Sequence, residues 1–173
     1  RYADFIQNNL HVITPNKKAG SGDYDYYQFL KQVSKKHQRY FLYETTVCAA
    51  LPVIHTLKDL LRTGDTVRNI RAVVSGSLSF IFNQVSRGCC FSDSVKQAHQ
   101  CGYTEPDPRE DLSGMDIARK MVCLAREMGH PATLDEIDGL NLVPKELQGV
   151  SKEEFLAQLH HYDEAMAVKI NQL

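Results

Sequence analysis

The sequence predicts an α/β (α+β) protein in which alternating helices and strands lead into a helix-rich part packed on a sheet. Apolar residues recur alternately at helical and strand spacing up to about residue 47, and after residue 51 most periodic segments have helical spacing. The chain has 173 residues, 43% of them apolar, and a net charge of -1, which is typical of an ordinary globular protein.

The first part of the chain predicts two parallel strands. Residues 1–9 have helical spacing, residues 10–14 are typical of a short buried strand, and the proline and glycines of 15–23 predict a loop. A helix over 23–38 and a strand over 39–47 follow, and a helical crossover makes its two strands parallel neighbours. The apolar side of the second helix is predicted to consist of Tyr26, Phe29, Leu30 and Val33.

The second part is predicted to be mostly helical, with one strand over 66–76. The predicted helices cover 51–65, 77–88, 92–102, 111–129 and the tail from 151 to 173. Ser92 or Ser94 is expected to cap the helix over 92–102. The buried stripe of the helix over 111–129 is predicted to be Ile117, Met121, Leu124 and Met128. Two strands cannot form a stable parallel sheet alone, so both parts are expected to be incomplete and to belong to a longer enzyme.

Several classes of function are not indicated. Basic residues are balanced by acids along the chain, which argues against nucleic acid as a partner, and no apolar run approaches the length of a membrane span. The five cysteines have no CxxC spacing and are expected to be reduced thiols, without a transition-metal site. The only GxG, at residues 20–22, lacks the third glycine of a dinucleotide fingerprint.

An acidic segment, GYTEPDPREDLSGMDIARK (102–120), is the strongest candidate for a site. Pro106 and Pro108 predict a stiff extended turn over 104–108 that restricts its carboxylates. Either Ser113 or Asp111 is expected to cap the next helix, in which Asp116 and Lys120 share a face beside the buried stripe. On spacing alone the favoured interpretation is a capped helix with a surface ion pair worth about 0.3–0.5 kcal/mol, because such pairs are common and weak.

This segment resembles the signature of homoserine dehydrogenases, with Ala98 completing the family pattern. VITPNKKA (12–19), YETTVCAALP (43–52) and SGSLSFIFN (75–83) resemble three further blocks of the family in the right order. The sequences of these blocks are most similar to the dehydrogenase half of bifunctional aspartokinase/homoserine dehydrogenases. These are multifunctional enzymes of threonine, methionine and isoleucine biosynthesis.

The resemblance implies an oxidoreductase that reduces L-aspartate 4-semialdehyde to L-homoserine with NADP or NAD as cofactor. By similarity Lys120 is the proton donor, and Lys17 is its catalytic partner near cofactor and substrate. Glu105 and Asp116 match the positions that bind the amino acid substrate, and Asp111 is expected to support them. Gly102 matches a position where the backbone passes close to the cofactor. Two ammonium groups that face one cleft make each other stronger acids.

The family also binds a monovalent cation, sodium or potassium, through Glu44 and backbone carbonyls that match Val47, Ala49 and Leu51. Here Cys48 and Ala50 stand where relatives commonly have glycine, and a side chain is costly if either backbone is left-handed. This departure puts the cation site in doubt, and Glu44 would then need another partner.

The resemblance implies that residues 1–45 are the end of a Rossmann-like NAD(P)-binding domain. Residues 46–173 would form the substrate-binding, catalytic and dimerisation domain, in a homodimer or higher homo-oligomer. Such an enzyme is expected in the cytoplasm, or in the chloroplast if the source is a plant, and the isolated segment is expected to be inactive. The alternative is a noncatalytic dimerisation or regulatory module whose acidic turn merely caps a helix.

Overall fold

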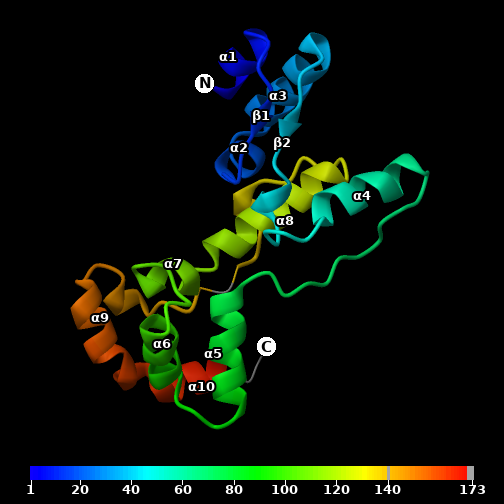
Figure 1. Cartoon of the computed structure of the whole chain (residues 1–173). Coiled ribbons are helices and arrows are strands. Elements are labelled where there is room, and N and C mark those ends of the chain that lie inside the picture. Colours follow the sequence, from blue (N-terminus) through cyan, green and yellow to red (C-terminus); the bar gives the residue numbers. More distant parts are fainter. Residues whose placement is uncertain (140, 171–173) are drawn as a thin grey trace. The chain divides into compact units, whose positions relative to one another are not determined.

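The structure of the chain is a computed structural model that describes residues 1–139 and 141–170 (Figure 1). The chain divides into two compact units. Unit 1 comprises Arg1–Val74 and Ile117–Asp138, and unit 2 comprises Ser75–Asp116 and the chain from Gly139 onward. The elements confirm the predicted α/β class, with helices far outnumbering strands in the described part of the chain.

Unit 1 contains the predicted alternation of helices and strands. Its elements are α1 (Tyr2–Gln7), β1 (Val12–Ile13), α2 (Lys18–Ser21), α3 (Tyr24–His37), β2 (Phe41–Leu42), the 3-10 turn η1 (Glu44–Thr46), α4 (Val53–Arg62), most of α8 (Met115–Glu127) and the 3-10 turn η2 (Leu134–Glu136). The two strands lie side by side in Figure 1 and pair in parallel, with Val12 opposite Phe41 and Ile13 opposite Leu42. The predicted parallel pairing is therefore confirmed.

Unit 2 consists of helices and short helical turns. It contains α5 (Gly76–Ser86), α6 (Phe91–Gln100), α7 (Pro108–Leu112), η3 (Lys145–Leu147), α9 (Lys152–Gln158), η4 (Leu159–Tyr162) and α10 (Asp163–Ile170). Its fully buried side chains include Ile81, Val95, Leu112, Leu142, Phe155 and Leu159. The tail is helical as predicted, although η4 divides it, and its last predicted residues, 171–173, lie outside the described part.

Three predicted elements are wrong. The segment 66–75 is not a strand, because a strand needs a hydrogen-bonded neighbour and none pairs with it among the described residues. The predicted loop over 15–23 contains the helical turn α2. The cap predicted at Ser92 or Ser94 is also wrong, because α6 begins at Phe91 and Asp163 of α10 accepts hydrogen bonds from the amide and hydroxyl of Ser92, both at 2.7 Å.

The buried faces of two helices are shifted from the predicted ones. In α3, Tyr27 is buried together with Leu30 and Val33, whereas Tyr26 and Phe29 are exposed. In α8, Leu124 is buried as predicted, but the other three members of the predicted stripe are only half-buried. The fully buried residues of α8 are Ala118, Val122, Cys123, Leu124 and Arg126.

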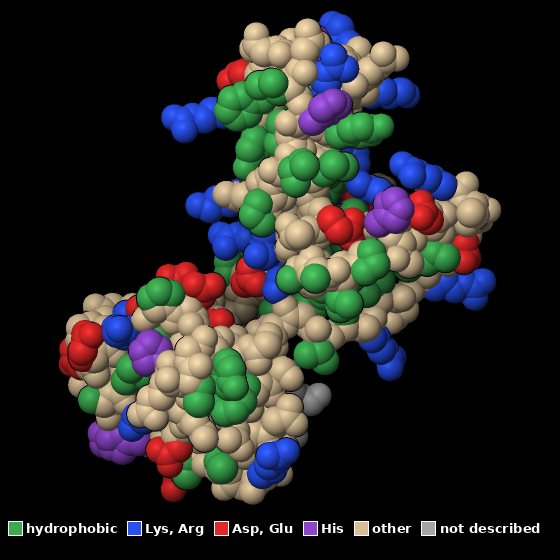
Figure 2. All heavy atoms as spheres, viewed as in Figure 1, with side chains coloured by type: hydrophobic (Ala, Val, Ile, Leu, Met, Phe, Trp, Pro, Cys, Tyr) green, Lys and Arg blue, Asp and Glu red, His purple; other side chains and the backbone are tan. Residues whose placement is uncertain are grey.

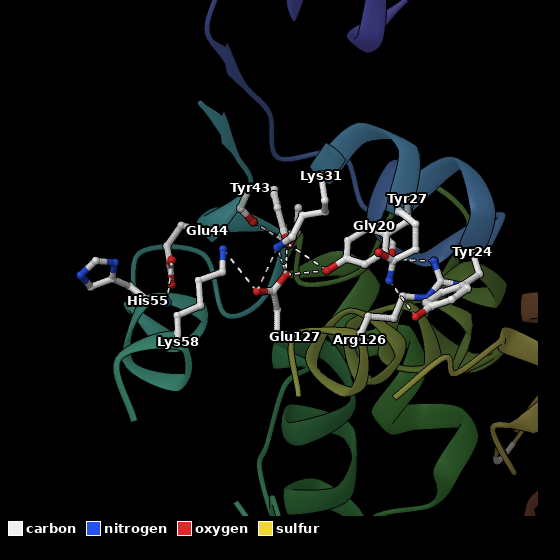
Figure 3. Close-up of polar contacts among 12 residues, drawn as sticks. Gly20, Tyr24, Tyr27, Lys31, Tyr43, Glu44, His55, Lys58, Arg126 and Glu127 are labelled. Atoms are coloured by element: carbon white, nitrogen blue, oxygen red, sulfur yellow. Dashed lines mark hydrogen bonds and ion pairs between the residues drawn. The ribbon is translucent and has the colours of Figure 1, made fainter. Parts of the chain in front are cut away.

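The core of unit 1 contains a carboxylate, Glu127, whose side chain is only 3% exposed. Lys31 of α3 lies 3.1 Å from one of its oxygens and Lys58 of α4 lies 3.3 Å from the other (Figure 3). The hydroxyls of Tyr27 and Tyr43 also donate to Glu127, with Tyr27 at 2.7 Å. Residues between Tyr27 and Lys58 thus meet the end of α8 at one buried charge. This charge is stable in the core because it is paired and hydrogen-bonded.

Burial and the neighbouring charge of Lys31 lower the pKa of Lys58 from 10.5 to about 8. The ammonium of Lys58 lies 4.8 Å above the ring of Tyr43, so part of its compensation for lost water comes from an aromatic face. Lys58 is therefore charged at neutral pH and titrates under mildly alkaline conditions.

Removing the charge of Glu127 should destabilise unit 1. We expect Glu127→Gln to lower the free energy of unfolding by about 2–4 kcal/mol, because two lysines lose their common carboxylate. Urea unfolding measures the change. Asp59→Asn is the matched control, since Asp59 is 53% exposed in its pair with Arg62, and we expect it to change stability by less than about 0.5 kcal/mol. Equal effects of the two substitutions would contradict the role of Glu127.

The pH dependence of stability should reveal Lys58. The unfolded chain holds the Lys58 proton up to about its ordinary pKa of 10.5, whereas the folded chain loses it near 8. Because the unfolded state binds more protons in this window, this group makes the fold more stable as the pH rises. We therefore expect the unfolding free energy of wild type minus that of Lys58→Met to increase from pH 8 to pH 10. A constant difference over that range would exclude the lowered pKa.

Candidate active site

The loop that carries Lys17 follows β1 and is held in a compact turn. Asn16 accepts a hydrogen bond from the amide of Lys18 at 2.8 Å, and Lys17 is the N-cap of α2. The carbonyl of Lys17 accepts from the amides of Gly20 at 3.0 Å and Ser21 at 2.9 Å. The backbone at Lys17 is therefore fixed locally, at the carboxyl end of a parallel strand, where open α/β sheets bind ligands.

A surface hollow of about 530 Å³ borders this loop. Its lining includes Asn16, Lys18 and Ala19 from the loop, together with Tyr2, Phe5 and Tyr26 from the adjoining helices. In Figure 2 basic side chains stand among exposed hydrophobic ones over the part that holds α1 to α3. The size of the hollow is in the range of small-molecule sites.

Lys120 lies in α8 and is half-buried. Its ammonium donates a hydrogen bond of 2.5 Å to the carbonyl of Val74, at the end of the segment that precedes α5. The next turn of α8 contains Cys123, whose pKa is raised to about 11 by burial, while the charges of Arg126 and Lys17 act in the opposite direction. A Cβ atom built on Gly20 of the Lys17 loop would lie 2.9 Å from the Sγ of Cys123, so this loop packs against the helix that carries Lys120.

In unit 2, Asp111 connects the acidic turn to α5. One of its carboxylate oxygens accepts from the hydroxyl of Ser77 at 2.6 Å, and the other accepts from the amide of Glu105 at 2.8 Å. Asp111 therefore fixes the backbone of Glu105. Its predicted alternative role as the cap of the helix over 111–129 is wrong, because Asp111 belongs to α7 and α8 begins at Met115. The other candidate cap, Ser113, accepts from the amide of Met115 at 3.3 Å.

The second proline of the acidic turn, Pro108, begins a helix. Asp107 is extended as predicted, but Pro108 is the first residue of α7, where a proline needs no amide hydrogen. Asp107 caps this helix and pairs with Arg109 at 2.6 Å, and these hydrogen bonds lower the pKa of its carboxyl. Arg109 also donates to the carbonyl of Val150 at 2.7 Å. Asp107 thus stabilises the turn through α7.

The predicted site residues are divided between the two units. Lys17 and Lys120 belong to unit 1, and Glu105, Asp111 and Asp116 belong to unit 2. Asp116 is in the first turn of α8, four residues before Lys120, so both side chains leave the same side of that helix.

Gly102 has a local structural explanation. Its φ is +72°, which favours glycine, and it lies just beyond the end of α6. The amide of Gly102 bonds the carbonyl of His99 at 3.0 Å, and the amide of Tyr103 bonds that of Ala98 at 2.9 Å. This pair of hydrogen bonds is a Schellman motif, which requires a left-handed residue at this position whether or not a cofactor lies near.

In the predicted cation segment, the Glu44 carboxylate binds backbone amides at the start of a helix. Both carboxylate oxygens of Glu44 accept backbone amides at the start of α4, from Ile54 at 2.8 Å and His55 at 2.9 Å (Figure 3). Glu44 thus caps α4 and has the alternative partner that its carboxylate needs. Among the described residues, no group of three or more His, Cys, Asp or Glu side chains could hold a metal ion.

The backbone of the same segment is left-handed at two residues. Cys48 has φ of +59° and Ala49 has φ of +48°, and neither is a glycine. The predicted cost of a side chain therefore applies at Cys48, whereas Ala50 is not among the residues with positive φ. Val47 is fully buried and Leu51 is 62% exposed.

Comparison with known proteins identifies the family. A family model described as homoserine dehydrogenase matches residues 52–172, and a second, described as homoserine dehydrogenase, NAD binding domain, matches residues 1–44. The chain belongs to the homoserine dehydrogenase family. It is 46% identical over 167 residues to bifunctional aspartokinase/homoserine dehydrogenase 1, chloroplastic, of Arabidopsis thaliana, a match that covers 96% of this chain and 18% of the relative. The chain thus spans about a fifth of the length of the curated relatives it matches.

Solved structures have the same fold. A Candida auris protein of unknown function has a TM-score of 0.91 and 38% identity, covering 99% of this chain and 50% of its own. A hyperthermophilic archaeal homoserine dehydrogenase mutant in complex with NADPH has a TM-score of 0.71 and 28% identity, covering 88% of this chain and 45% of its own. No helix in the described part of this homoserine dehydrogenase chain has both the length and the apolar character to cross a bilayer.

Two buried charged residues were missed by sequence reasoning. Arg126 and Glu127 follow each other at the end of α8. The available signal was weak: residues 121–125, directly before this pair, are all apolar. Apart from Ala132, their partners lie in residues 20–58, too far along the sequence for spacing to reveal them.

Replacing the left-handed cysteine should stabilise the protein. We expect Cys48→Gly to raise the free energy of unfolding by about 0.5–1 kcal/mol, because glycine adopts positive φ without strain. Ala50→Gly is the matched control and should lower it by a few tenths of a kcal/mol or more, since only chain entropy changes there. Thermal unfolding of both variants decides the matter, and a loss of stability in Cys48→Gly would contradict the assigned backbone.

Proposed function

We propose that this chain is the part of a homoserine dehydrogenase that reduces L-aspartate 4-semialdehyde to L-homoserine with NADP or NAD. The observation that carries the proposal is the packing of the Lys17 loop on α8, the helix of Lys120, where Arg126 of α8 donates hydrogen bonds to the carbonyls of Gly20 and Gly22. The family models match this chain almost throughout. Residues 1–45 would end the NAD(P)-binding domain and residues 46–173 would form the substrate-binding, catalytic and dimerisation domain.

In this proposal Lys120 donates the proton. A nicotinamide cofactor, when bound, would supply the hydride that reduces the aldehyde carbon. The Lys120 ammonium gives its proton to the carbonyl oxygen, which becomes the hydroxyl of the product. The amine of Lys120 then takes a proton from solvent. The hydrogen bond to the Val74 carbonyl supports this role, because it orients the Lys120 ammonium.

Glu105 and Asp116 are proposed to bind the ammonium of the amino acid substrate, since carboxylates form strong charge-assisted hydrogen bonds with it. The hydrogen bond from the Glu105 amide to Asp111 supports this role, because it fixes the position from which the Glu105 side chain starts. Asp111 is thus proposed as a supporting residue and not as a ligand of the substrate.

Lys17 is proposed to contact both cofactor and substrate. The fit of a nicotinamide cofactor is supported by the amide and ammonium groups of Asn16 and Lys18 around the hollow beside β1. Gly102, the second proposed cofactor contact, has the required backbone, although the Schellman motif explains it equally well. A monovalent cation at Glu44, Val47, Ala49 and Leu51 fits poorly, because the Glu44 carboxylate already caps α4.

The longer relatives suggest the wider context. An aspartokinase fused to the dehydrogenase, as in the Arabidopsis thaliana relative, and a homodimer or higher homo-oligomer are proposed for the full-length protein. Its location would be the cytoplasm, or the chloroplast in a plant.

Replacing Lys120 tests the proposed function. In the full-length protein we expect Lys120→Met to lower kcat for homoserine oxidation by about 100- to 10,000-fold, because the proton-transfer group is lost. NADPH affinity, measured by fluorescence titration, should stay within about threefold of wild type. Lys36→Met is the control, since Lys36 is exposed in α3. Near-normal turnover in Lys120→Met would remove the catalytic role, and absence of any dehydrogenase activity in wild type would favour a noncatalytic module.

A further inference from the structure

Arg126, the residue before Glu127 in α8, is buried with only 4% of its surface exposed. Its three guanidinium nitrogens each donate to a backbone carbonyl. The acceptors are Ala132 at 2.9 Å, Gly20 at 2.9 Å and Gly22 at 2.7 Å. The guanidinium also lies 5.2 Å from the ring centre of Tyr24 and 5.5 Å from that of Tyr27. Figure 3 shows it between these rings and the carbonyl of Gly20.

Two of the three acceptors belong to the turn that carries Lys17. Gly20 donates its amide to the Lys17 carbonyl, and Gly22 donates its amide to the Lys18 carbonyl at 2.9 Å. The same two glycines give their carbonyls to Arg126. A short hydrogen-bonded path therefore runs from Arg126 through α2 to the backbone of Lys17, and we call Arg126 with these two carbonyls the Arg126 clamp.

A second contact holds the same turn against α8. A Cβ atom built on Gly20 would lie 2.9 Å from the Sγ of Cys123, which is closer than such atoms approach. The backbone of Gly20 therefore packs directly on α8, one turn after Lys120. Gly22 is restricted as well, because a Cβ there would lie 2.6 Å from the carbonyl oxygen of Lys18.

We propose that Arg126 is a positioning residue that docks the Lys17 turn on the helix of Lys120. The inference rests on the proposed function of the two lysines, but it concerns a different residue. Lysine could not replace Arg126, because three acceptors on two segments require the planar fork of a guanidinium. Misplacing a reacting group by about 1 Å can cost about 100-fold in rate. A residue that fixes the position of the Lys17 turn therefore has a large effect on kcat.

Hydrogen exchange tests the clamp without any assay of activity. In Arg126→Lys and Arg126→Met we expect the amides of Gly20, Ser21 and Gly22 to exchange at least about tenfold faster than in wild type. Arg62→Met is the control, since the Arg62 side chain is 72% exposed in α4, and it should leave these amides unchanged. Unchanged exchange in both Arg126 variants would overturn the proposal.

Kinetics of the full-length protein separate positioning from general stability. For Arg126→Lys we expect kcat per folded molecule to fall by about 10- to 100-fold, with KM for homoserine and affinity for NADPH within about threefold. A purely structural role would lower the folded fraction and leave kcat per folded molecule unchanged, and that result would also overturn the proposal. If wild type and Lys120→Met both lack dehydrogenase activity, the proposed function fails, and the exchange experiment still decides the clamp.

A compensation experiment does not require loss of Arg126. We expect Gly20→Ala to lower kcat about tenfold, because its new methyl group displaces the turn from Cys123. Adding Cys123→Ala removes the Sγ atom and should restore kcat to within about twofold of the Cys123→Ala single variant. Wild-type kcat in Gly20→Ala would contradict the close packing of this turn on α8.

Discussion

Unit 1 depends on two consecutive charged residues that end helix α8 inside the protein. Arg126 donates hydrogen bonds to backbone carbonyls, and Glu127 binds ammonium and hydroxyl groups. The end of one helix therefore pairs with both acceptors and donors from other elements. Since charges of this kind are stable in a core only when fully paired, each residue determines where several other elements must lie. The contacts reach α2, α3, α4 and the residue that follows β2.

The polar contacts of unit 2 follow a different principle, because short links near helix ends position its acids. Asp111 joins the amide of Glu105 to the start of α5, Asp107 caps α7, and Asp163 reaches the start of α6. Each carboxylate accepts amides that a helix or turn leaves without an internal partner. The density of acids in residues 102–120 is therefore largely structural, and only Glu105 and Asp116 are assigned to the substrate in the proposed function.

The parts of the fold that could be predicted from the sequence are those determined by local spacing. Helical periodicity located α3, α4, α5 and the tail, and the crossover rule gave the parallel pairing of β1 with β2. Local spacing could not identify Tyr27 instead of Tyr26 as the buried residue, because the partner of its hydroxyl is Glu127, 100 residues away along the chain. The strand predicted over 66–76 failed for a similar reason, since alternation alone supplies no hydrogen-bonded neighbour.

For the proposed site, the resemblance named the residues, and the structure gave most of their hydrogen-bond partners. The resemblance named Lys17, Lys120 and Glu105, and it also named Asp111 as a supporting residue. The links of Lys17 to Gly20 and of Lys120 to Val74 were not predicted, because backbone groups leave no mark in a sequence. The doubt over the cation segment was justified in its reasoning at Cys48, which is left-handed, although Ala49 and not Ala50 is the second such residue.

The position of Asp116 and Lys120 on one helix has a consequence for the geometry of the proposed site. Their separation is one helical turn, roughly 6 Å of rise, and the backbone hydrogen bonds of α8 set it. The spacing of this acid and this amine is therefore set within a single helix and does not depend on the tertiary contacts that position Glu105 or Lys17.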